Sequence, residues 1–216
     1  MNDFRSGPEF AALMVSLRRI EDVNRVAFEA AQTSERSAPD RQDRRSLERE
    51  NKLLGRQLRS ALICSAYSIA EAVILGFAPK SKEKYEVLKS KVQVAYCLGD
   101  EKPSALHLEQ YQLQHVLGVC RGEKWDKDWL ELHELRVMRN FLLHSGGIGE
   151  ENKLLKKIGR KKEFSAWIEP MFEGSNAPIY VLVVGEMEFR QWLQRLQSFL
   201  HDIGAELSKL GAKTEK

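Results

Sequence analysis

The sequence predicts an all-α protein, a helical bundle with a small β-hairpin before the last helix. Apolar residues recur at intervals of three and four along most of the 216 residues, which is the spacing of one helix face. Proline and glycine interrupt these runs, and residues 180–184 stand out as rich in β-branched and aromatic side chains. With 43% hydrophobic and 30% charged residues, the composition is that of a soluble globular chain.

The N-terminal part predicts a helix followed by a linker. Residues 8–31 carry apolar side chains at helical spacing. Residues 33–46 are polar, charged and interrupted by Pro39, which favours a linker or loop. The predicted organisation is an arm and linker at 1–45, a main helical domain at 46–210 and a flexible tail at 211–216.

A long core helix is predicted from Leu47 to Phe77. Ser46 is suited to cap its N-terminus, and Pro79 breaks it just after Phe77. Residues 61–75 are apolar nearly all round, so we expect this half to lie deep in the core. The predicted apolar stripe is Leu47, Leu54, Leu58, Leu62, Ala66, Ile69 and Val73.

Three shorter helices follow, each ended by glycine. The first covers 82–99 and ends at Gly99, the usual place for a residue with left-handed backbone. The second covers 104–118, and the third covers 128–145 and stops at a pair of glycines. The segment "RGEKWDKDW", residues 121–129, is expected to connect the last two.

The C-terminal part predicts the hairpin and a final amphipathic helix. Residues 163–168 and 178–184 read as two strands on either side of a turn-rich segment. The final helix is expected at about 187–210. Its apolar face is Phe189, Trp192, Leu193, Leu196, Phe199, Leu200, Ile203 and Leu207.

Net charge, cysteine spacing and hydropathy limit the classes of protein to which this chain can belong. The net charge of +3 does not by itself argue for nucleic acid. Cys64, Cys97 and Cys120 form no C-x-x-C pair, so neither a disulfide framework nor a zinc site is indicated, and no cofactor is expected. Uninterrupted apolar runs fall short of the roughly 18 residues of a membrane span, and the N-terminus lacks a secretory pattern. We therefore expect a cytoplasmic protein without a membrane partner.

A polar strip runs along the predicted helix 128–145. At about 100° per residue, His133, Arg136, Asn140 and His144 fall on one line, with Arg139 just beside it. Arginine offers a fork of donors suited to phosphate, histidine exchanges protons near neutral pH, and asparagine orients either group. The expected core side of the helix is Leu135, Val137, Met138, Phe141 and Leu142.

An ordinary surface role is the alternative interpretation of this strip. Arginine and histidine on a half-exposed helix are commonly solvated or paired with carboxylates. Glu131 and Glu134 are placed to pair with Arg136 or Lys127.

The segment "ELRVMRNFLLHSGG" resembles the signature of the HEPN superfamily. That signature is an arginine, four to six residues, and a histidine; here it is Arg139 and His144, with Asn140 directly after the arginine. The apolar helix "LRSALICSAYSIAEAVIL" resembles the first core helix of such domains, and the resemblance covers about residues 46–210. It implies a helical bundle that dimerises, with the two signature helices meeting in one composite cleft.

The resemblance also implies an activity, which is metal-independent cleavage of RNA by attack of the ribose 2′-hydroxyl on the phosphodiester. His144 is then the general acid and base, Arg139 neutralises the phosphate, and Asn140 positions the histidine or the scissile group. The expected supporting residues are Arg136, Glu71 and His133. For Glu71, a structural pairing with Arg136 or Arg139 is an equally good interpretation.

RNA binding requires contacts beyond the catalytic pair. The basic run after the signature supplies Lys153, Lys156, Lys157, Arg160, Lys161 and Lys162. A second basic stretch, at 41–59, is interspersed with acids and favours a solvated surface. Trp125, Trp129 and Tyr111 are candidates to stack on bases, with core packing as the alternative.

Two functional hypotheses follow from the resemblance. The first is a HEPN-type endoribonuclease that acts as a toxin or anti-phage defence effector, with a cognate antitoxin or defence protein as partner. The second is a non-catalytic HEPN-fold module for binding nucleotide or protein and for dimerisation. Some HEPN toxins carry a modifiable tyrosine two residues after the histidine, but Gly146 stands here, so we do not expect that regulation.

Overall fold

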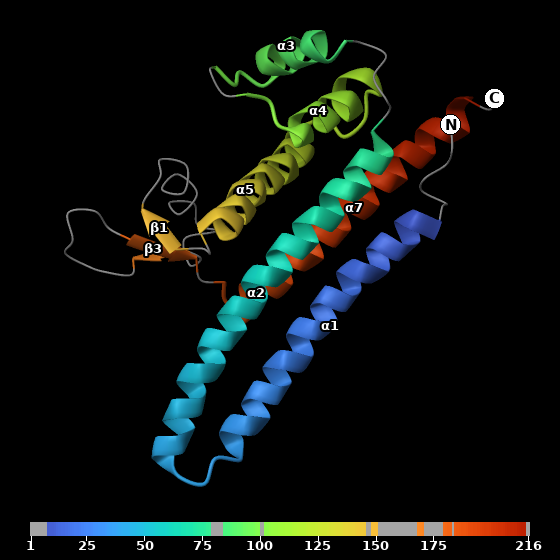
Figure 1. Ribbon diagram of the computed structural model, residues 1–216. Helices are drawn as coiled ribbons and strands as arrows, with labels where there is room; N and C mark the ends of the chain where they lie inside the picture. The colour runs from blue at the N-terminus through green and yellow to red at the C-terminus, as the bar shows by residue number, and fades with distance from the viewer. Residues whose placement is uncertain are drawn as a thin grey trace. The chain divides into compact units, whose positions relative to one another are not determined.

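The protein is all-α, as the sequence predicts. The computed structural model describes residues 8–78, 84–99, 102–145, 148–150, 168–170, 179–182 and 184–214. Its helices, drawn in Figure 1, are α1 (Pro8–Arg36), α2 (Arg41–Phe77), α3 (Tyr85–Ala95), α4 (Ala105–Tyr111), the π-helix η1 (Gln112–Val116), α5 (Glu123–Ser145) and α7 (Glu186–Thr214).

The contacts divide the chain into two compact units, each described below by itself. Unit 1 consists of residues 1–14, 69–133 and 196–216, and unit 2 of residues 15–68 and 134–195. Four long helices, α1, α2, α5 and α7, therefore contribute residues to both units.

The link between α1 and α2 is much shorter than the sequence predicts. It consists of residues 37–40, because α1 continues to Arg36 and α2 begins at Arg41 instead of Leu47. Asp40 caps α2: its Oδ1 accepts hydrogen bonds from the backbone N–H groups of Gln42 and Asp43, at 2.7 and 2.8 Å. Charged residues that read as a linker thus form the exposed first turns of a helix.

The buried face of α2 is offset from the predicted stripe. Ile63, Ala66 and Tyr67 are buried in unit 2, whereas Leu54 is 60% exposed. In unit 1 the same face continues with Ala70, Val73, Ile74 and Phe77. The predicted stripe follows fixed intervals of three, four and seven residues. Because an α-helix has 3.6 residues per turn, such a stripe gradually rotates away from the core along a long helix.

Unit 1 contains the short helices. Gly99 and Gly118 have φ of +59° and +72°, the left-handed conformation expected at a helix end. Ser104 and His107 form a capping box at the start of α4, in which each side chain bonds to the backbone of the other. The predicted helix 104–118 is therefore α4 continued by a π-helical turn, η1.

Helices α5 and α7 supply most of the aromatic core. The eight residues predicted for the apolar face of α7 are all buried, which confirms that face. Helix α5 begins at Glu123, five residues earlier than predicted, and buries Trp129, Leu132, Leu135 and Met138. Three of the expected core residues, Val137, Phe141 and Leu142, are only half-buried.

Three short strands precede α7. They are β1 (Ile148–Glu150), β2 (Ile168–Pro170) and β3 (Ile179–Leu182), in the antiparallel order β1-β3-β2. Tyr180 lies opposite Gly149 on one side and Pro170 on the other. The predicted hairpin extends beyond the described residues of this segment and stays a prediction.

Among the described residues, one helix has the length and composition of a membrane span. Helix α2 contains an 18-residue window that passes this test, although uninterrupted apolar runs in the sequence are shorter. In the structure 39% of that window is buried, which is compatible with the core helix of a soluble protein.

Candidate functional site

Arg139 of the predicted site makes two contacts within unit 2. It is half-buried on α5 in unit 2, and its Nη1 donates a hydrogen bond to Asn140 Oδ1 at 3.0 Å. Its guanidinium carbon lies 5.9 Å from the centre of the Tyr67 ring, within the range of a cation–π contact. Asn140 therefore orients the arginine, and its carbonyl is occupied in doing so.

Neither arginine of the strip is neutralised by a carboxylate of the described residues. The Nε atoms of Arg136 and Arg139 are buried and have no hydrogen-bond partner there. A buried donor without a partner costs free energy, because water that would solvate it is excluded. The buried Nε atoms are out of reach of an external anion, so any anion would have to be bound by the Nη groups of these arginines.

Cys64 lies beside Arg139 on the α2 side of unit 2. Burial raises the pKa of its thiol, and the nearby positive charge of Arg139 opposes this rise. Since burial is the larger cause, the thiol stays protonated at neutral pH, and the structure does not make it a nucleophile.

His144 lies on the last turn of α5 and is exposed. It lies five positions after Arg139, which corresponds to about 7.5 Å along the helix and about 140° around it. The described residues of unit 2 show no hydrogen bond between His144 and either Arg139 or Asn140. One copy of α5 therefore presents the two signature side chains in different directions.

The other two supporting residues, Glu71 and His133, lie in unit 1. His133 Nε2 is 2.8 Å from Gln110 Oε1, and its ring stacks on His107 at a centroid distance of 4.0 Å. These contacts tie His133 to α4 and account for it structurally.

This part of unit 1 contains a polar network that the sequence analysis missed. Gln114 Oε1 accepts hydrogen bonds from Tyr96 Oη and Gln110 Nε2, and Gln114 Nε2 donates to the carbonyl of Cys120. Glu109, Gln110, Gln112 and Gln114 are all at least 93% buried. The available signal was the density of polar residues in "HLEQYQLQH", but a π-helical turn changes which residues share a face.

Glu109 is a buried acid on α4, the helix that also supplies Gln110. Burial, assisted by the charge of Glu71, raises the pKa of Glu109 to about 7. Its Oε2 has no hydrogen-bond partner among the described residues. Glu109 is therefore an acid that changes charge near neutral pH.

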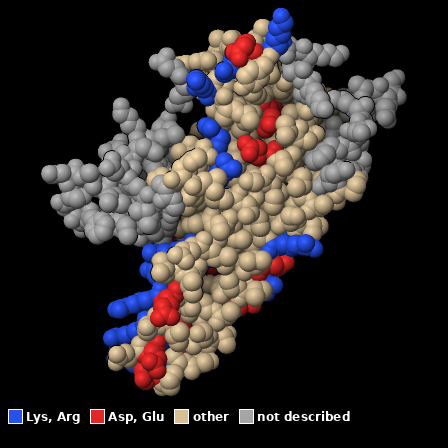
Figure 2. All heavy atoms as spheres, in the orientation of Figure 1, with Lys and Arg blue, Asp and Glu red and all other residues tan. Residues whose placement is uncertain are grey.

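Most of the predicted RNA-binding side chains lie outside the described residues. This holds for Lys153, Lys156, Lys157, Arg160, Lys161 and Lys162. The basic stretch of α2 is described, and Figure 2 shows its Lys and Arg side chains at the edge of the α1–α2 hairpin with acidic ones beside them. At the turn, Arg41, Arg44 and Arg45 line a cavity of about 440 Å³ with Asp40 and Glu48.

The aromatic candidates for base stacking are occupied within unit 1. Trp129 is buried and meets Phe199 edge-on at 5.1 Å, and Trp125 lies 5.9 Å from the same ring. Tyr111 stacks on His115 at 4.6 Å. Core packing therefore explains Trp129, while Trp125 and Tyr111 are half-buried and keep part of their surface exposed.

Among the described residues, no group of three or more His, Cys, Asp or Glu side chains could hold a metal ion. Comparison of the chain with protein-family models, with curated proteins and with solved structures finds no match.

Proposed function

We propose that this protein is a metal-independent endoribonuclease of the HEPN type, acting as a toxin or defence effector. The observation that carries the proposal is the state of Arg139. Its guanidinium is held by Asn140 and the Tyr67 ring, and its buried Nε lacks a partner in the described residues. To bind a phosphodiester and stabilise its transition state, a guanidinium must be oriented and must not already be paired with a carboxylate.

The proposed reaction needs proton transfer and charge neutralisation. The ribose 2′-oxygen attacks the adjacent phosphorus and loses its proton, while the bond to the 5′-oxygen breaks and that oxygen gains a proton. The products are a 2′,3′-cyclic phosphate and a 5′-hydroxyl end. His144 is the proposed proton carrier, and Arg139 the group that stabilises the developing charge on phosphate oxygens.

Two copies of α5 are needed to complete the proposed site. Within one copy, Arg139 and His144 point apart around the helix, so they do not converge on one phosphate. A twofold arrangement of two α5 helices would bring the arginine of one copy to the histidine of the other.

A non-catalytic binding module is the second candidate. The exposure of His144, without a bond to Asn140 or Arg139, favours it. In that case Arg139 binds an anionic ligand and the histidine plays no part.

The test is RNA cleavage by the purified full chain in the presence of EDTA. We expect wild-type protein to cleave total RNA, and Arg139→Ala and His144→Ala each to lose roughly 100-fold or more of the rate. Arg25→Ala and His201→Ala are matched controls, because both residues are exposed and lie on other helices; they should cleave normally.

Each possible result distinguishes the candidates. Cleavage that continues in both signature variants, or that EDTA abolishes, contradicts the proposal. RNA binding without cleavage, lost in Arg139→Ala but kept in His144→Ala, would favour the binding module.

A further inference from the structure

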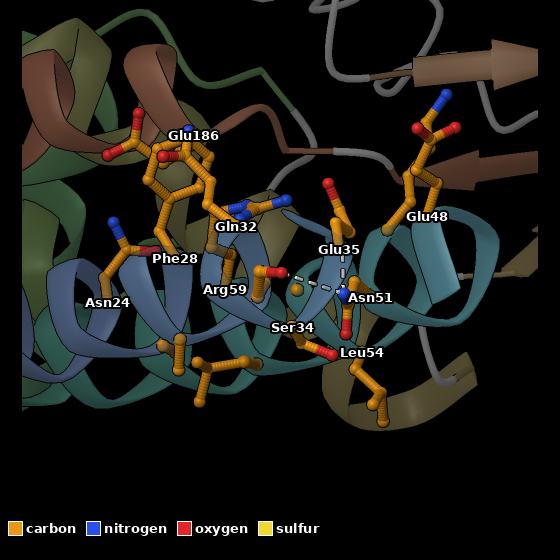
Figure 3. Close-up of a pocket in the computed structure, with 16 residues that line it drawn as sticks. Asn24, Phe28, Gln32, Ser34, Glu35, Glu48, Asn51, Leu54, Arg59 and Glu186 are labelled. Carbon is orange, nitrogen blue, oxygen red and sulfur yellow. Dashed lines mark hydrogen bonds between the residues drawn. The ribbon is translucent and has the colours of Figure 1, made fainter. Parts of the chain in front are cut away.

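A groove in unit 2 lies between α1 and α2, far along the sequence from the proposed catalytic residues. Its volume is about 750 Å³, which is the size of a small-molecule site. Ala27, Ala31 and Gly55 line it with little bulk, and Phe28 presents a ring that is 37% exposed. Figure 3 shows the labelled side chains along this groove, from Asn24 to Glu48.

One end of the groove contains a buried polar atom that lacks a partner. Asn24 lines the groove and is 98% buried, and its Oδ1 has no hydrogen-bond partner in the described residues. An amide oxygen in that state costs free energy unless a donor reaches it. By contrast, Asn51 in the same groove is satisfied by the carbonyl of Ala31 and by Glu35, at 3.2 and 3.1 Å.

Arg59 supplies a cation to the same groove. Its Nε donates to the carbonyl of Val184 at 2.5 Å, which fixes the plane of the guanidinium. In the described part of the chain this is its one hydrogen bond, so both Nη groups are left to bind a ligand. Gly55 makes room for them, since an added Cβ would lie 3.2 Å from Nη1.

No carboxylate of the described residues forms an ion pair with Arg59, although the charges of Glu186 and Glu188 act on it. Glu186 lines the groove, but its Oε1 accepts a hydrogen bond from Arg190 at 2.6 Å. Glu35 is bonded to Asn51 farther along α1. Burial lowers the pKa of Arg59, and the charge of Glu186 opposes this. A bound anionic ligand would also favour the charged form of Arg59 and so raise its pKa.

We propose that this groove binds an amphipathic small molecule with a flat apolar body. One anionic group of that molecule is held by Arg59, and one hydrogen-bond donor is directed at Asn24. The apolar body lies against Phe28 and the small side chains of the groove. This proposal is independent of the ribonuclease proposal, because it uses none of the signature residues.

The test uses two fluorescent probes that differ only by charge. 8-Anilinonaphthalene-1-sulfonate has two aromatic groups, a sulfonate and an N–H donor, and N-phenyl-1-naphthylamine lacks the sulfonate. We expect the full-length chain to bind the anionic probe saturably, and Arg59→Met to weaken it about tenfold while leaving the neutral probe unchanged. Asn24→Leu should weaken both probes, because both lose the same acceptor.

Two further variants make the result decisive. Arg49→Met is the matched control, since Arg49 is exposed on the same helix and does not line the groove, and it should bind both probes normally. Ala31→Phe fills the groove and should abolish binding without lowering the melting temperature. The proposal is overturned if Ala31→Phe binds the probe as well as wild type, or if Arg59→Met and Arg49→Met behave alike.

Discussion

Glu109 makes the stability of this protein depend on pH. Its pKa is raised from 4.5 to about 7 in the folded state, so between these values the folded chain holds a proton that the unfolded chain releases. Stability therefore falls as pH rises from about 4.5 to about 7. We expect Glu109→Gln to exceed wild type by about 1–2 kcal/mol at pH 8, and by little at pH 4.

Urea denaturation at the two pH values measures this difference. Glu86→Gln is the control, because Glu86 is exposed and should show no such pH dependence. An equal gain at both pH values would mean that packing, and not the charge of Glu109, is responsible.

Two positive φ angles give a second prediction about single residues. Cys97 adopts φ of 50° although it is not glycine, while Gly99 adopts +59° with nothing within 4 Å of an added Cβ. Cys97→Gly should stabilise the chain by about 0.5–1 kcal/mol, and Gly99→Ala should destabilise it by about 1 kcal/mol. Thermal melts of both variants check the prediction, and shifts of the same sign would contradict it.

At the scale of elements, α2 begins at a cap that the sequence analysis placed six residues too late. Asp40→Ala removes the acceptor for Gln42 and Asp43 and should cost about 1 kcal/mol of stability. Asp43→Ala, in the first turn of the helix, should cost only a few tenths of a kcal/mol. Chemical denaturation of the two variants compares them, and equal losses would argue against a capping role for Asp40.

The apolar pattern of the sequence determines where prediction succeeds among the elements. The face of α7 was predictable residue by residue, because eight apolar residues repeat at helical spacing on one helix. The starts of α2 and α5 were not, since Arg41 and Glu123 begin turns made mostly of charged residues. At α2 a capping acid, Asp40, decides the start.

The residues proposed for the candidate site come from the sequence, but the contacts between them could not be predicted from it. The predicted strip placed Arg139 and Asn140 side by side. The spacing could not show that Asn140 accepts a hydrogen bond from Arg139 and makes none with His144. The buried Gln110 and Gln114 were missed, because a π-helical turn alters the register that periodicity relies on.

At the scale of the whole molecule, the ribonuclease proposal predicts complementation between inactive chains. If Arg139 of one copy acts with His144 of the other, a mixed dimer of Arg139→Ala and His144→Ala contains one intact site. Random mixing should then restore about a quarter of wild-type cleavage, since half the dimers are mixed and each has one site of two.

Cleavage by the co-refolded mixture, compared with each variant alone, measures this. A mixture as inactive as its components would exclude the shared site, and a monomeric wild-type protein in sedimentation would exclude it independently.

The bond between Arg139 and Asn140 also restricts what can stand at position 140. An amide oxygen holds the guanidinium without removing its charge, whereas the carboxylate of an Asn140→Asp variant, differing by a single heavy atom, would form an ion pair with it. The arginine would keep its place and lose its attraction for a phosphate. The residue at position 140 would then decide whether Arg139 can bind an anion, with almost no change in the structure.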